Sequence, residues 1–186
     1  MTTVYVVTRL ITFFGTFLRT FWEQLVCRLC KIPAEDIRAF KFDELCGHVE
    51  HEIIKKTSHA FLMCWLPFTL NFTLGTMFLL TGAYRVFYIG EMSLTSFGVL
   101  WMGISCIANC APSFEDMLAL KDCVYGGSNK VLKVILAPFF GVVCAIACLE
   151  KYSLTFVLSV LYAVVFPHVF SVFIPALHKL IVLVTN

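Results

Sequence analysis

The sequence predicts an all-α integral membrane protein, with four transmembrane helices preceded by an amphipathic interfacial helix. Three observations predict this class. Of the 186 residues, 60% are hydrophobic and only 14% are charged, whereas a soluble domain has about 25% charged residues. The charged residues cluster before residue 60 and between residues 115 and 133. Long uncharged runs make up most of the remaining sequence.

Four uncharged runs are candidate spans, because a bilayer core of about 30 Å needs roughly 20 residues of helix. They are residues 60–84, 92–114, 134–149 and 152–177. Only Glu150 and Lys151 separate the last two, which predicts a tight helical hairpin. We therefore treat residues 60–186 as a four-helix transmembrane bundle.

Residues 1–30 place polar and apolar side chains at spacings of three and four, the period of an amphipathic helix. Their longest uncharged internal run, residues 10–18, is too short to cross a bilayer. We therefore expect a continuous helix over residues 4–30 in the membrane interface. A tilted, bundled transmembrane helix is the alternative, and a mitochondrial presequence stays open because residues 1–22 contain no acid.

The two faces of this helix have different expected surroundings. The aromatic face should lie in lipid or against the bundle, and the arginines should point toward water. The aromatic residues are Phe13, Phe14, Phe17, Phe21 and Trp22, and the arginines are Arg9, Arg19 and Arg28.

Residues 31–59 form a polar connector in water or at the headgroups. Lys31 to Asp36 predicts a break and then a helix start, with Pro33 marking the break. His48, His51, Glu52 and His59 follow, and His and Glu are zinc ligands. The protease motif needs a second histidine four residues after the first, but residue 55 is Lys. A solvated interfacial face is therefore favoured over a zinc site.

Three polar residues lie inside or at the end of the candidate spans: Asn71, Asn109 and His168. An asparagine at that depth usually forms a hydrogen bond to another helix. An intramembrane histidine is a functional candidate by default. Alternatively, His168 is a neutral imidazole bonded to a carbonyl group that Pro167 or Pro175 leaves free.

Small residues gather on the second and third spans, where they let helix backbones approach closely. We expect both sets to pack within the bundle. They are Gly98, Gly103, Ser105, Cys106 and Cys110 on the second span, and Gly141, Cys144, Ala145, Ala147 and Cys148 on the third.

Ser113 and Asp116 have the spacing of a capping box at the start of a helix. The chain enters the first span at His51 and Glu52 and leaves the second span near Asp116. These two points lie on the same side of the membrane in a four-span topology. We therefore expect His51, Glu52 and Asp116 to lie close together at the inner membrane boundary.

Several short motifs resemble those of a poorly characterised group of small prokaryotic membrane proteins, which look like distant relatives of polytopic zinc metalloproteases. The motifs are His51-Glu52, Ala60-Phe61, Leu66-Pro67-Phe68 with Asn71, the run from Trp101 to Ser105, and Pro112-Ser113 with Asp116. The resemblance covers roughly residues 47–120. It implies a metal site made by His51, Glu52 and Asp116, with Glu52 as the candidate catalytic residue. The chain has Asn109 where the group has a histidine, so this site would be degenerate.

Charge bias predicts the orientation. With four spans, twelve of the fourteen Lys and Arg residues share one side with both termini, and only Arg85 and Lys151 lie on the other. The positive-inside rule then places both termini on the cytosolic side. A net charge of +2 gives no nucleic-acid footprint.

These observations favour a non-catalytic membrane protein, a subunit or scaffold whose partners are the lipid bilayer and other membrane subunits. No cofactor is then expected. A zinc metallohydrolase using His51, Glu52 and Asp116 is the alternative, and a small transporter or channel is the third possibility.

Overall fold

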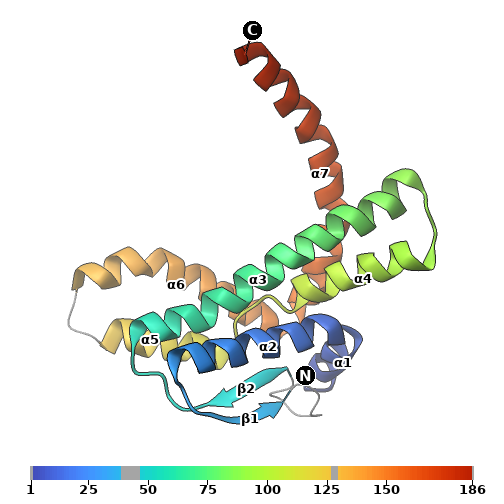
Figure 1. Cartoon of the computed structure of the whole chain (residues 1–186). Helices are drawn as coiled ribbons and strands as arrows, with labels where there is room; N and C mark the ends of the chain where they lie inside the picture. Colours follow the sequence, from blue (N-terminus) through green and yellow to red (C-terminus); the bar gives the residue numbers. More distant parts are fainter. Residues whose placement is uncertain (1, 39–46, 127–129, 186) are drawn as a thin grey trace.

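The computed structural model describes residues 2–38, 47–126 and 130–185, which are mainly helical (Figure 1). A π-helical turn, η1 (Arg85–Ile89), extends α3, and two short strands, β1 (Ala34–Arg38) and β2 (His48–His51), pair antiparallel. The helices are α1 (Thr2–Ile11), α2 (Phe13–Cys30), α3 (Thr57–Tyr84), α4 (Leu94–Ala108), α5 (Phe114–Gly126), α6 (Lys130–Lys151) and α7 (Leu154–Thr185).

Three helical segments of the described chain are long and apolar enough to cross a membrane: Thr57–Ile89, Lys133–Glu150 and Leu154–Phe173. The pair α1 and α2 makes a fourth if it is one broken span. The structure therefore agrees with a helical, multi-pass membrane protein. Only Tyr152 and Ser153 separate α6 from α7, but the two helices do not fold back on each other as the predicted tight hairpin: α6 lies beside the N-terminal half of α3, and α7 rises away beside its C-terminal half (Figure 1).

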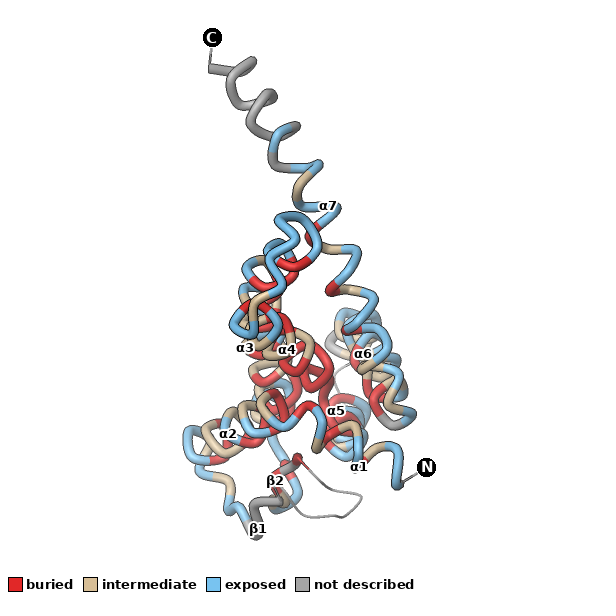
Figure 2. The backbone as a smooth tube through the Cα atoms, turned by 90° about the vertical axis from the view of Figure 1, so that its right-hand side faces the viewer, coloured by how far each residue is buried: buried red, intermediate tan, exposed pale blue. Residues whose placement is uncertain are grey.

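Helix α3 runs along the molecule, and the other helices divide between its two halves (Figure 1). Helices α5 and α6 lie beside its N-terminal half, where the Trp65 and Phe139 rings are 6.3 Å apart. Helices α4 and α7 lie beside its C-terminal half, where Thr76 and Tyr162 hydroxyls are 3.4 Å apart. Helix α7 extends beyond the bundle (Figure 1), and Val169, Val172 and Phe173 are exposed where it does so (Figure 2).

The predicted second span is shorter than expected. Residues 92–114 are uncharged, but α4 covers only Leu94–Ala108. Its 15 residues measure about 22 Å, less than the roughly 30 Å of a bilayer core. The helix ends because the side-chain amide of Asn109 takes part in tertiary hydrogen bonds, and Pro112 lies in the irregular segment before α5.

The predicted continuous helix over residues 4–30 is wrong. Helices α1 and α2 meet at Thr12 with a bend of 93°. The Thr12 carbonyl accepts from Ser105 Oγ (2.8 Å) and from Asn109 Nδ2 (3.3 Å) on the α4 side. Threonine hydroxyls at Thr8, Thr12 and Thr16 also bond to carbonyls one turn back, which favours bending.

The predicted direction of the arginines is also wrong for two of the three. Arg9 is 4% exposed and Arg19 is fully buried, because both pair with acids inside the bundle. Arg28 is exposed, as expected. Phe13, Phe17 and Phe21 are exposed on the opposite face of α2, with Phe17 53% exposed. The α1–α2 pair therefore turns its polar face inward and its aromatic face outward.

The connector contains a small sheet instead of the helix start expected after Pro33. Helix α2 ends at Cys30, as the predicted break requires, and Lys31 adopts a left-handed conformation (φ 55°). The following chain is extended because β2 docks on α2. The Val49 amide donates to Glu23 Oε2 (3.0 Å), and Gly47 lies against Thr16.

Glycines set the close approach of α3, α4 and α2. A Cβ atom on Gly82 would lie 2.4 Å from the backbone nitrogen of Leu100, and one on Gly15 would lie 2.0 Å from the carbonyl oxygen of Ser105. Gly98 and Gly141, in contrast, have nothing within 4 Å. The small residues of α6 differ in burial: Ala147 is buried, but Gly141, Ala145 and Cys148 are exposed. The expected packing of these three residues inside the bundle is therefore wrong.

Candidate functional site

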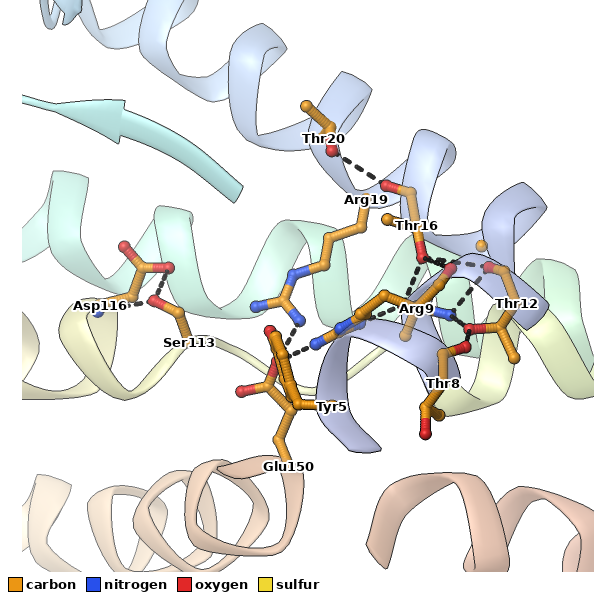
Figure 3. Close-up of polar contacts among 12 residues, drawn as sticks. Tyr5, Thr8, Arg9, Thr12, Thr16, Arg19, Thr20, Ser113, Asp116 and Glu150 are labelled. Carbon is orange, nitrogen blue, oxygen red and sulfur yellow. Dashed lines mark hydrogen bonds and ion pairs between the residues drawn. The ribbon is translucent and has the colours of Figure 1, made fainter. Parts of the chain in front are cut away.

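The most polar part of the interior is a group of four charged residues, which we call the ionic centre: Arg9, Arg19, Glu23 and Glu150. Figure 3 shows Arg9, Arg19 and Glu150. All four are at most 4% exposed. Glu150 Oε1 accepts from Arg9 and, at 2.9 Å, from Arg19. Arg19 Nε donates to Glu23 Oε1 at 2.8 Å. Two arginines thus face two glutamates, and their charges balance.

Uncharged polar groups surround Asn109 beside the ionic centre. Asn109 Oδ1 accepts from Arg9 and from Thr16 Oγ1 (2.9 Å). Its Nδ2 donates to Thr12 Oγ1 at 2.8 Å and to the Ser105 carbonyl at 2.7 Å. Such bonds are needed because an unpaired amide in an apolar interior costs about 1–3 kcal/mol.

Asn71 connects three helices, as the sequence predicted for a polar residue at that depth. Its Nδ2 donates to the Asn109 carbonyl at 3.0 Å, and its Oδ1 accepts from Trp22 Nε1 at 3.0 Å. Asn71 therefore joins α3 to α2 and to the end of α4.

Three helix breaks meet at this level, near the middle of α3. They are the bend at Thr12, the end of α4 at Asn109 and the α6–α7 junction beside Glu150. Helix ends leave backbone groups without helical partners. Irregular backbone at membrane depth is tolerated only where protein or a polar cavity covers it. The polar groups around Asn109 supply such partners, for example to the Thr12 and Asn109 carbonyls.

A small pocket opens beside the ionic centre. Tyr5, Arg9, Asn109 and Glu150 line it together with hydroxyl-bearing residues of α1 and of the α6–α7 junction. Tyr5 donates its hydroxyl to Glu150 Oε1 at 3.3 Å, and the Arg9 guanidinium lies 4.9 Å from the centre of the Tyr5 ring. Arg19 Nη2 is buried and has no hydrogen-bond partner among the described residues.

His51 and Asp116 lie together, as the sequence predicted. His51 Nε2 is 3.1 Å from Asp116 Oδ1, and His51 Nδ1 is 2.9 Å from the Glu52 carbonyl oxygen. Both ring nitrogens face acceptors, and only the imidazolium can donate from both. The hydrogen bond with Asp116 is the main cause that raises the pKa of His51 to about 9, against the opposing effect of burial.

Asp116 also has the predicted capping role. Its backbone N–H donates to Ser113 Oγ at 2.9 Å, and Ser113 Oγ donates to Asp116 Oδ2 at 2.6 Å. The capping bonds fix the carboxylate at the first turn of α5, where the helix dipole favours negative charge.

Glu52 does not join His51 and Asp116. Its side chain is exposed, and its backbone N–H donates to the Pro33 carbonyl at 3.2 Å. Successive side chains of extended backbone point to opposite faces, so His51 and Glu52 cannot both turn toward Asp116. Within residues 2–38, 47–126 and 130–185, no three His, Cys, Asp or Glu side chains gather closely enough to hold a metal ion. Among the described residues, the predicted ligands His51, Glu52 and Asp116 therefore do not gather into a three-ligand zinc site.

His168 bonds to a side chain and not to the carbonyls near Pro167 or Pro175. The Tyr88 hydroxyl lies 2.5 Å from His168 Nδ1, and Ser171 Oγ donates to the same hydroxyl at 3.0 Å. Tyr88 belongs to η1, so this contact joins the end of α3 to α7. The arrangement can hold the two helices together.

The His51–Asp116 pair predicts a pH-dependent stability. The folded pKa of about 9 lies above the ordinary value of 6.5. The contribution of the pair to the free energy of unfolding is on the order of 1 kcal/mol after solvent screening. It should be complete below pH 6.5 and lost as the pH rises through 9. Thermal unfolding of the solubilised protein at several pH values measures this loss. His51→Gln should remove most of it, and an unchanged pH profile in that variant would contradict the assignment.

Sequence reasoning missed the ionic centre. A usable signal was present, because Arg9, Thr12, Thr16, Arg19 and Glu23 recur at spacings of three and four within an apolar segment. That spacing places the polar groups on one face of a helix. Such a face can turn toward the interior of a bundle as well as toward water. Glu150 is the acid between the last two apolar runs. It was the available partner for an inward-facing arginine.

Comparison of the chain with protein-family models, with curated proteins and with solved structures gives no match in any of the three. The resemblance to relatives of zinc metalloproteases therefore stays a prediction.

Proposed function

We propose that this chain is a non-catalytic integral membrane protein that acts as a subunit or scaffold of a larger membrane assembly. One observation carries the proposal: the polar groups turn inward and pair, whereas the outward faces of the candidate spans are apolar. The ionic centre joins α1, α2 and the end of α6 through charges that neutralise one another. Paired in this way, these charges hold helices together.

The outward face of α6 is suited to close contact with another helix. Val134, Pro138, Gly141, Ala145 and Cys148 are exposed and recur at spacings of three and four. Gly141 and Ala145 are four residues apart, and small residues at that spacing let membrane helices approach closely. A Cβ atom added to the glycines at the α2, α3 and α4 contacts inside the bundle would meet a neighbouring atom at 3.0 Å or less. A Cβ atom added to Gly141 would meet nothing within 4 Å, and this open space supports a partner helix at this face.

Of the four predicted spans, those at α3, α6 and α7 coincide with helices long and apolar enough to cross a membrane, whereas α4 is a shorter apolar helix. Arg9 and Arg19 are buried and no longer count in the charge bias. In the predicted four-span topology, ten Lys and Arg residues then remain on the proposed cytosolic side, twelve less two, and Arg85 lies on the other, whereas Lys151 follows Glu150 at the α6–α7 junction.

Both termini share the cytosolic side if the bent α1–α2 pair re-enters the membrane and returns. Protease protection of tags at the two ends, in sealed vesicles, should give the same result for both. Opposite results would make α1–α2 a full span.

A small transporter is the second candidate, and the convergence of three helix breaks on buried charges favours it. Discontinuous helices form substrate and ion sites in many transporters. The subunit proposal ranks first because the charges of the ionic centre pair within the chain. Mild-detergent extraction of the full-length protein, followed by mass determination and metal analysis, tests whether the subunit or the transporter is correct. Co-purifying membrane proteins without stoichiometric zinc support the subunit, and a solitary chain that moves a solute across vesicles supports the transporter.

A further inference from the structure

Four segments that are distant in the sequence meet at the end of the molecule where α2 ends and α3 begins (Figure 1). Thr57 Oγ1 donates to the Cys123 carbonyl at 3.3 Å, and Cys123 Sγ donates to the Ile54 carbonyl at 3.0 Å. Lys133 Nζ donates to the Tyr125 carbonyl at 2.8 Å. These bonds join the start of α3, the end of α5 and the first turns of α6. The C-terminal turn of α2 packs into the same apolar cluster.

The side chains at this end are mostly basic, and we call them the basic end. They are Arg28, Lys31, Lys55, Lys56, Lys121 and Lys133, all exposed except the half-buried Lys133. The described exposed acids on the same helices and on the connector before α3 are Glu52, Glu115 and Asp122. Six cations therefore stand against three acids among the side chains that the structure describes here, and their local charge is positive.

Large apolar side chains project from the same segments. Ile53 is 86% exposed two residues before Lys55, and Leu29 is 64% exposed between Arg28 and the end of α2. An apolar side chain exposed between cations gains free energy when it enters the acyl boundary while the cations stay among the phosphates. Contact with water alone would not favour the exposed positions of Ile53 and Leu29.

We propose that the basic end is a docking surface for the headgroups of anionic phospholipids. Lys55 and Lys56 pair with headgroup phosphates, and Ile53 enters the acyl boundary beside them. Charge complementarity identifies the partner, because a cytosolic leaflet carries anionic lipids that attract basic residues next to a membrane span. Lys55 and Lys56 lie directly before α3, the longest candidate span. The inference rests on the membrane location and is independent of the subunit role.

The test uses the full-length protein in mild detergent with equal amounts of phosphatidylglycerol and phosphatidylcholine. Native mass spectrometry at low ionic strength counts the lipids that stay bound. The wild-type protein should retain phosphatidylglycerol preferentially. The double variant Lys55→Gln/Lys56→Gln should bind it roughly tenfold more weakly, because each cation near an anionic surface contributes. Higher salt should weaken the wild-type preference, since exposed charges are screened.

Two controls separate lipid binding from folding. Lys55→Arg/Lys56→Arg keeps the charge and should keep the preference. Arg85→Gln removes an exposed cation at the other end of α3 and should leave lipid retention unchanged. Thermal unfolding of each variant confirms that it folds. Equal retention of the two lipids by the wild type would overturn the proposal, as would an equal loss in Arg85→Gln.

Discussion

Glu150→Gln should destabilise the protein by about 3–5 kcal/mol, the largest single-residue effect we expect. Glu150 accepts from Arg9 and Arg19, which are both buried. Its neutral replacement would leave two guanidinium groups inside the bundle with only Glu23 as a charged partner in the ionic centre. Helices α1 and α2 should then detach from the end of α6. Thermal unfolding in detergent and protease cleavage within residues 2–30 measure the effect.

Glu91→Gln is the matched control for Glu150. Glu91 is exposed, and its carboxylate lies 3.9 Å from Arg85. An exposed ion pair contributes about 0–1 kcal/mol, so this variant should be nearly as stable as the wild type. Equal effects of the two substitutions would mean that the ionic centre does not hold α1 and α2 in place.

Gly15→Ala should cost about 1–3 kcal/mol because a Cβ atom at this position overlaps the α4 backbone. The Ser105 carbonyl oxygen would lie 2.0 Å away, and this group cannot move without α4. Gly15 N–H also donates to Ser105 Oγ at 2.8 Å, so displacement of α2 would lengthen this bond. The weakened contact should lower the unfolding temperature and expose Trp22, which intrinsic fluorescence detects.

Gly98→Ala is the control for this substitution, because Gly98 lies on α4 with nothing within 4 Å of its added Cβ. Alanine is the better helix former by about 1 kcal/mol. Gly98→Ala should therefore be neutral or stabilising. Destabilisation of the same size at both positions would show that helix propensity, and not contact between α2 and α4, decides the result.

The membrane class and the break between α6 and α7 were predictable because the lengths of uncharged runs follow directly from bilayer thickness. The meeting of His51 with Asp116 was predictable because consecutive spans return the chain to the same side. The hydrogen bonds of Asn71 to other helices were predictable because an unpaired amide in an apolar interior is costly. Each of these predictions depends on local composition or on chain order alone.

The inward face of α1–α2 was not predictable, because amphipathic spacing defines two faces without saying which one meets the protein. In water the apolar face turns inward, whereas inside a membrane bundle the polar face can do so. The position of the bend at Thr12 depends on Asn109 and Ser105, which lie more than 90 residues away in sequence. Only the tertiary structure brings those partners together.

Asn109 illustrates the difference between a motif and its surroundings. The resemblance treats it as a histidine position that has lost a ligand. In the structure its amide bonds to Thr12 and Ser105 and its oxygen accepts from Arg9 and Thr16. The residue therefore has a structural role at the meeting point of three helix breaks.

The most direct test of the subunit proposal compares wild-type protein with Gly141→Leu/Ala145→Leu after mild-detergent extraction from its native membrane. Mass determination, identification of co-purifying proteins and metal analysis are made on both. The proposal predicts a wild-type complex larger than one chain, without stoichiometric zinc, whose partners are lost in the variant while the fold persists. A single chain that carries one zinc ion, lost in His51→Ala and unaffected by the α6 substitutions, would contradict it.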